Sequence, residues 1–243
     1  MRALGLLAGR YLLSKRRERF ITAIGAIAVL GVALGVAALI TVIAVMTGFD
    51  QDLQSKIIGA NAHLTVQADG PMRDADAVIA RLAQVPGITA ASPFVQGQAL
   101  AEFGTASTGI VVRGIDPARE RHVTDLAKYL VRGTLDPGPE GILLGKVLAQ
   151  RLGVRPGESV RLVTQANQQP RSLTVTGLFA CGMYDYDANL ALTRLATAQS
   201  LLGLSQTVTG VGARVEDPLH AGRGQMAVRR TLGYPYWVLT WME

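Results

Sequence analysis

Apolar and polar positions divide the chain into one long apolar segment and a mixed region. Phe20–Phe49 holds thirty residues without an Asp, Glu, Lys or Arg. A helix of that length extends about 45 Å, and the hydrocarbon core of a bilayer is roughly 30 Å thick. The sequence therefore predicts a membrane-spanning helix that projects beyond the bilayer as a stalk, and Asp50–Ile58 continues the helical pattern.

Beyond the stalk, extended and helical patterns mix without strict βαβ alternation. The predicted extended segments are His63–Gln67, Ile88–Phe103, Ile110–Ile115, Gly141–Leu144, Ser159–Thr164, Ser172–Phe179, Val208–Val215 and Trp237–Thr240. Five helical segments are predicted. The first begins after Asp74, which can cap it, and ends at Pro86-Gly87, and the second is a short segment from Asp116-Pro117 to about Leu130. The others are Lys146–Leu152, which Gly153 closes, Leu195–Leu202 and Leu219–Leu232. This mixture predicts an α+β fold.

We expect three parts along the chain. Residues 1–19 form a basic cytoplasmic segment, and its leucines among Lys and Arg suit a short helix lying on the membrane surface. Residues 20–49 form the transmembrane helix and the start of the stalk. Residues 50–243 form a domain on the far side of the membrane.

The net charge of +6 is concentrated at the start of the chain. Residues 1–19 hold six basic residues, among them Lys15, Arg16, Arg17 and Arg19, against one acid, which leaves +1 for the remainder. Lys/Arg bias before a span places the N-terminus in the cytoplasm, so the charge indicates topology and not nucleic-acid binding. Binding of anionic lipid headgroups by the same cluster is the alternative.

Two further readings of the span stay open. A cleaved signal peptide has an apolar region of about 7–15 residues, shorter than this one, although Ala60-Asn61-Ala62 resembles a cleavage site. Gly31 and Gly35 form a GxxxG in a helix rich in Gly and Ala, which predicts packing on another helix. Small residues are also common in membrane helices without such packing.

The sequence contains no recognisable catalytic, cofactor-binding or metal-binding constellation. The segment Gly141–Val147 lacks the spacing and the hydroxyl residue of a phosphate loop, and His63, His122 and His220 are isolated. Tyr184–Asp187 reads as a polar loop or sheet edge. We therefore expect no enzyme activity and no cofactor in this chain.

Two features in the last third of the chain concern packing. The single cysteine, Cys181, lies in an apolar stretch and is predicted to be a small buried hydrophobic residue, and no intramolecular disulfide is possible. Tyr234, Tyr236, Trp237 and Trp241 indicate either the approach to a membrane surface or the core of a last strand.

Several motifs together resemble those of one membrane-protein family. The run Arg16–Ile21, then Gly31–Leu39 and Val45–Phe49, resembles the first membrane helix of lipoprotein-releasing ABC permeases. Gly141–Lys146 with Leu152–Glu158 is similar to a segment of the wider macrolide-exporter and cell-division permease class. Gly177–Asp187, Val208–Gly210 and Asp217-Pro218 resemble the lipoprotein-releasing branch, and the resemblance covers essentially the whole chain.

The resemblance implies a permease subunit in a bacterial inner membrane with its main domain in the periplasm, of α/β type with two subdomains. It implies a separate cytoplasmic ABC ATPase subunit, a second permease subunit, lipoprotein cargo and a periplasmic carrier chaperone as partners. Family members continue with three more membrane helices, so a chain ending at Glu243 is expected to be a fragment or a truncated product. They also have a longer loop where this chain has Gln165–Pro170, so the resemblance does not carry chaperone docking to this loop.

On this resemblance, acyl chains of the cargo would meet the outer end of the span. Val42, Val45, Met46 and Phe49 lie there at helical spacing on one face, and Met and Phe give adaptable apolar contacts. Ordinary lipid-facing or helix-facing residues are the alternative. Two other functions stay open: a membrane-anchored sensor or adaptor without transport, and a permease of a related exporter or cell-division branch.

Overall fold

The computed structural model describes residues 19–166 and 169–243, so Lys15, Arg16, Arg17 and most of the predicted interfacial segment lie outside the described residues. The chain divides into two compact units between Leu53 and Gln54. Helix α2 (Arg19–Ala60) forms the described part of the first unit, and its last residues, Gln54–Ala60, belong to the second.

Helix α2 confirms that the apolar segment and the pattern after it form one continuous helix of 42 residues. Among the described residues, it is the one helix whose length and composition suffice to cross a membrane, with a mean hydropathy of 2.7 over its most apolar window. None of that window is buried against the rest of the protein.

The second unit contains one ten-stranded mixed sheet with the order β10-β1-β9-β2-β3-β8-β5-β7-β4, and β6 pairs with both β2 and β7. The strands are β1 (Leu64–Ala68), β2 (Ile88–Phe103), β3 (Ala106–Ile115), β4 (Leu130–Arg132), β5 (Gly141–Gly145), β6 (Ser159–Val163), β7 (Arg171–Phe179), β8 (Leu190–Arg194), β9 (Gly210–Val215) and β10 (Tyr236–Thr240). The pairs β3–β8 and β5–β7 are parallel, and the other pairs are antiparallel.

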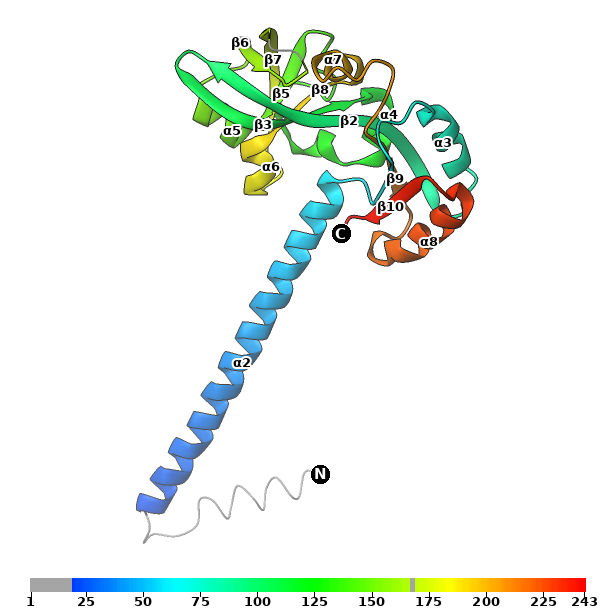
Figure 1. Cartoon of the computed structure of the whole chain (residues 1–243). Coiled ribbons are helices and arrows are strands. Elements are labelled where there is room, and N and C mark those ends of the chain that lie inside the picture. Colours follow the sequence, from blue (N-terminus) through cyan, green and yellow to red (C-terminus); the bar gives the residue numbers. More distant parts are fainter. Residues whose placement is uncertain (1–18, 167–168) are drawn as a thin grey trace. The chain divides into compact units, whose positions relative to one another are not determined.

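The pairing gives the sheet two parts. Strands β2, β3, β8, β5, β7 and β6 each pair with the next, and β6 returns to β2, so these six strands close a ring. Strands β9, β1 and β10 continue from the other half of β2 as an open wing. The long β2 runs through both parts (Figure 1).

Short helices cover both parts. They are α3 (Ala75–Leu82), α4 (Pro117–Val123), the 3-10 turn η1 (Leu126–Tyr129), α5 (Lys146–Leu152), α6 (Tyr184–Asn189), α7 (Leu195–Leu201), the 3-10 turn η2 (Pro218–His220) and α8 (Ala221–Leu232). Helices α3 and α8 pack on the wing, and α5, α6 and α7 pack on the ring. Figure 1 shows α3 and α8 at one end of the unit and α5 at the other.

The core has two clusters on opposite faces of the ring. The larger contains Ile142 and Leu144 of β5 and continues into the wing through Leu64 and Val211. The smaller contains Leu143 of the same strand, together with Leu126, Phe179, Leu190 and Leu192. Alternate residues of β5 therefore enter different cores, which explains why its sequence is apolar at every position.

The α+β prediction and most predicted elements are confirmed. Gly153 closes α5 in the left-handed conformation with φ of 75°, as expected from glycine after a last helical residue. One detail is wrong: Asp74 precedes α3, but its side chain forms no capping hydrogen bond. The backbone of Asp74 has φ of −100° and ψ of 42°, outside the extended conformation usual for a helix cap.

Candidate functional site

The predicted acyl-contact residues form one exposed face of α2. Val42, Val45, Met46 and Phe49 are 65%, 67%, 60% and 57% exposed. Their spacing of three and four residues aligns them along the helix. This face offers flexible apolar side chains to alkyl chains or to another helix, and contact with acyl groups stays a prediction.

The GxxxG face of α2 is also open. A Cβ added at Gly31 or Gly35 would meet no atom within 4 Å in the described structure. Close approach of another helix backbone is therefore sterically possible, and packing there stays a prediction. The helix begins at Arg19, and the orientation inferred from the basic cluster stays a prediction as well.

The last residues of α2 are held in the second unit by contacts with two other elements. The Tyr186 hydroxyl of α6 donates to the Asn61 side-chain oxygen at 2.6 Å, and the Asp125 backbone N–H donates to the Gly59 carbonyl at 2.7 Å. A Cβ at Gly59 would collide with the Tyr129 hydroxyl, so glycine permits the close approach of α2 and η1. We call these contacts the helix junction.

Asp125 connects the helix junction to the wing. Its carboxylate contacts the Lys128 ammonium at 3.1 Å and the Arg214 guanidinium of β9 at 3.3 Å. Burial favours the neutral carboxyl, but the hydrogen bonds from Lys128 and Arg214 outweigh it and lower the pKa of Asp125. Asp125 thus stays ionised at neutral pH and joins the end of α2 to two neighbouring elements.

Tyr184–Asp187 is not the polar loop or edge that the sequence suggested: it forms the start of helix α6. Asp187 is buried, and its carboxylate accepts hydrogen bonds from the backbone N–H groups of Cys181 and Gly182 at 2.9 and 3.1 Å. The Cys181 thiol also donates to it at 3.2 Å. These hydrogen bonds stabilise the turn at Cys181 and Gly182 before α6. Helix α6 also contains Tyr186, which contacts Asn61 in the helix junction.

Cys181 is buried, as predicted. Burial, with a further contribution from the hydrogen bond to Asp187, raises the pKa of its thiol to about 11. Nucleophilic cysteines instead have a pKa below the ordinary value, which produces thiolate at neutral pH. Cys181 therefore packs in the core and contributes a hydrogen bond.

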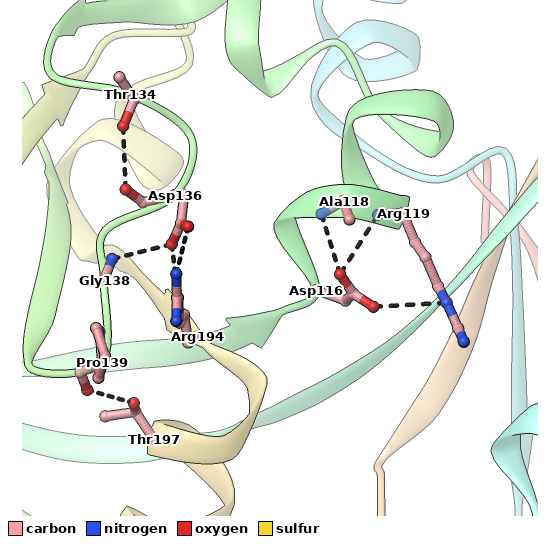
Figure 2. A network of polar contacts seen from close by, with 9 residues as sticks. All are labelled: Asp116, Ala118, Arg119, Thr134, Asp136, Gly138, Pro139, Arg194 and Thr197. Carbon is pink, nitrogen blue, oxygen red and sulfur yellow. Dashed lines mark hydrogen bonds and ion pairs between the residues drawn. The ribbon is translucent and has the colours of Figure 1, made fainter.

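A second polar network fixes the connection between β4 and β5, and Figure 2 shows its members. The Asp136 carboxylate forms two hydrogen bonds with the Arg194 guanidinium and accepts the Gly138 N–H at 3.0 Å. These bonds lower the pKa of Asp136 to about 2. The Thr197 hydroxyl donates to the Pro139 carbonyl at 2.7 Å, so two elements, β8 and α7, hold one loop.

Neither network resembles a catalytic site. Their charged groups are paired with each other. The described residues contain no group of three His, Cys, Asp or Glu side chains placed to hold a metal ion. Two open grooves of about 580 and 630 Å³ share Gln98, Thr164 and Gln165, and their lining combines amide groups with Leu and Val.

His63 occupies a buried position directly before β1. Its Nδ1 lies 3.1 Å from the Val215 carbonyl oxygen and 3.2 Å from the Val215 backbone nitrogen, so the ring hydrogen-bonds the backbone at the end of β9. Burial lowers the pKa of His63 below its ordinary value of 6.5. The folded state therefore favours the neutral ring.

Acidification is expected to destabilise the second unit through His63. With the folded pKa lowered, the unfolded chain binds the proton more readily, so stability is complete above pH 6.5 and falls as the pH drops below it. Between pH 7.5 and 5.0, the unfolding temperature should fall about 2–4 °C further in the unchanged protein than in His63→Asn, whose side-chain amide carries both a donor and an acceptor. The exposed His122→Asn is the control, and equal pH profiles for all three proteins would refute the assignment.

The sequence patterns could not identify the helix junction. Asn61, Asp125 and Tyr186 are separated by 64 and 61 positions in the sequence, and neither spacing nor periodicity indicates that they meet. The one local signal was Asn61 directly after a long helix, a position where asparagine is common.

The sequence matches a described family and several curated proteins. Residues 26–231 match the family described as MacB-like periplasmic core domain. The chain is 38% identical to "Lipoprotein-releasing system transmembrane protein LolC" of Xylella fastidiosa (strain Temecula1), over 98% of this chain and 60% of that protein. A LolC of Neisseria meningitidis is 33% identical, over 87% and 54% of the two chains. The chain thus spans 60% or less of the length of these relatives.

Solved structures share the fold. The periplasmic region of MacB from Actinobacillus actinomycetemcomitans gives a TM-score of 0.52 at 12% identity, covering 77% of this chain and 92% of that one. The extracellular domain of the ABC-type transporter YknZ from Gram-positive bacteria gives 0.51 at 15% identity, covering 73% and 99%. At these identities the likeness concerns the fold alone.

Proposed function

Because the chain belongs to the family of MacB-like periplasmic core domains, we propose that it is the N-terminal part of a permease subunit that releases lipoproteins from a bacterial inner membrane. The observation that carries the proposal is the 38% identity over 98% of the chain to a protein named for lipoprotein release. The rest of such a subunit would supply further membrane helices.

In this proposal, α2 crosses the inner membrane with its N-terminus in the cytoplasm, and the second unit lies in the periplasm. The support is the apolar composition of α2, the charge of +5 in residues 1–19 and the periplasmic domains that share the fold. The family description likewise refers to a periplasmic domain.

The energy for release would come from a separate cytoplasmic ATPase subunit, and a second permease subunit would complete the transporter. Movement of α2 would then reach the rest of the second unit through the helix junction, because Gly59 bonds Asp125 directly before η1 and Asn61 bonds Tyr186 of α6. A periplasmic carrier chaperone would receive the cargo. Co-purification with an ATPase separates this function from that of a sensor or adaptor.

The outer end of α2 is where the cargo's acyl chains would bind. A photo-crosslinking residue at Met46, in the full-length subunit assembled with its ATPase, is expected to trap lipoprotein at least threefold more efficiently than one at Ile40. Ile40 is 61% exposed, and its position places it on the opposite face of the helix from Val42 and Met46. Mass spectrometry of the adducts gives the yield, and equal labelling at both positions would contradict acyl binding at this face.

A further inference from the structure

One end of the wing lies beside the connection from α2 to β1. β1 begins at Leu64, four residues after the helix ends, and β10 ends at Thr240 opposite Leu64. The Trp241 N–H donates to the His63 carbonyl at 3.1 Å. Strand β9 also ends here, since the Val215 N–H bonds the His63 ring. We call this the entry end.

Helix α8 begins at the same end. The Trp241 indole N–H donates to the Pro218 carbonyl of η2 at 2.7 Å, directly before α8. The Gln225 side chain in α8 donates to the Glu243 carboxylate at 2.9 Å. Residue Trp241 is therefore packed and hydrogen-bonded as part of the domain, whereas Trp237 is 52% exposed. Trp241 thus fits the core explanation, and a membrane-facing role for Trp237 stays a prediction.

The outer face of α8 combines cations with exposed apolar side chains. Arg223, Met226 and Arg230 recur at intervals of three and four residues, so they share one face, opposite the buried face of the helix. Leu219 in η2, Met226 and Met242 are each between 56% and 59% exposed. We call Leu219, Arg223, Met226, Arg230 and Met242 the entry-end surface.

The positive charge of this surface is not neutralised within the described structure. Helix α8 contains three arginines and no acid, and neither Arg223 nor Arg230 forms an ion pair in residues 19–166 and 169–243. Nearby acids have other partners: Asp217 contacts His220 at 2.7 Å, and Glu243 accepts from Gln225 and Thr240. The exposed Glu216 is the remaining acid beside η2.

We propose that the entry-end surface binds the anionic phospholipid headgroups of the bilayer that α2 enters. Arg223 and Arg230 flank the exposed Met226 on one face of α8, and a cluster of arginines without acids attracts anionic lipids, whose phosphates pair with guanidinium groups. The chain leaves α2 at Ala60 and begins β1 at Leu64, so the entry end follows the membrane helix directly along the chain. The proposal rests on membrane insertion of α2 and is independent of lipoprotein release.

The experiment places an environment-sensitive NBD fluorophore at Met226→Cys, in the full chain with Cys181→Ala, reconstituted in nanodiscs. Discs of phosphatidylcholine alone are compared with discs containing 30% phosphatidylglycerol, with a spin-labelled headgroup lipid as quencher. We expect at least twofold stronger quenching in the anionic discs, and its loss in 0.5 M salt. The control fluorophore at Ser107→Cys, an exposed position near the start of β3, should not respond to lipid charge.

A charge reversal completes the test. Arg223→Glu with Arg230→Glu should abolish the difference between the two lipid mixtures, while an unchanged far-UV circular dichroism spectrum shows that the protein is folded. Equal quenching in both mixtures, absence of quenching at position 226, or quenching that survives the charge reversal would each overturn the proposal. Retention of the chain in the discs reports insertion of α2 separately.

Discussion

Replacement of Glu120 by alanine is expected to lower the free energy of unfolding by about 3–5 kcal/mol. Glu120 of α4 is 1% exposed, and its carboxylate lies 3.7 Å from the Arg113 guanidinium of β3. Among the described residues, removing the acid would leave the buried cation with the Phe94 ring, 4.7 Å away, as its remaining partner. Urea unfolding followed by tryptophan fluorescence measures the loss, because Trp237 and Trp241 both lie in the second unit.

Two further variants test whether an uncompensated buried charge causes the loss of stability in Glu120→Ala. The exposed Glu216→Ala should change stability by less than about 0.5 kcal/mol. The double variant Arg113→Met with Glu120→Leu should recover most of the loss, because an apolar pair has no charge to desolvate. The Nε of Arg113 is buried without a hydrogen-bond partner, so the native pair is incompletely satisfied. If the double variant were as unstable as Glu120→Ala, uncompensated charge would not be the cause.

Gly145→Ala is the second substitution with a large expected effect, a loss of about 3 kcal/mol. A Cβ at Gly145 would lie within 3.0 Å of three backbone atoms of Asp187. Backbone cannot rotate away as a side chain can, so α6 would have to move. That movement would disturb both the Asp187 turn at Cys181 and the contact of Tyr186 with Asn61.

A matched glycine tests whether close approach is the reason. Gly109 lies in β3 of the same ring, and a Cβ there would meet no atom within 4 Å. Gly109→Ala should therefore leave the unfolding temperature within about 2 °C of the unchanged protein. Hydrogen exchange should accelerate at Cys181–Asn189 in Gly145→Ala and not in Gly109→Ala. Similar behaviour of the two variants would exclude the steric explanation.

Local patterns predicted most of the second unit. β2 has the predicted bounds, α5 ends at its glycine cap, and β6 pairs with β7 across the predicted polar loop. These elements are defined by neighbouring residues: apolar runs, Gly and Pro at turns, and a helical repeat. The family resemblance is confirmed by the matching family and by the relatives named for lipoprotein release.

The contacts that place the candidate sites could not be read from the sequence. Tyr184–Asp187 alternates aromatic and acidic residues, which suggested an extended segment, but the hydrogen bonds to Asp187 stabilise a helical turn instead. The buried pair of Arg113 and Glu120 looks in the sequence like two ordinary surface charges, because its burial depends on the packing of α4 over the sheet. Such tertiary contacts override local preference.

The sixteen residues of β2 fix the alignment of strands that belong to different parts of the molecule. Ile88–Phe94 pairs with β9, and Leu100–Glu102 pairs with β6. Successive side chains of a strand point to opposite faces, so a slip of one position would turn over every side chain of the slipped strand. An insertion or deletion within β2 would therefore shift its pairing with β9 relative to its pairing with β6. Length variation among natural sequences should instead fall in the turn at Gly104.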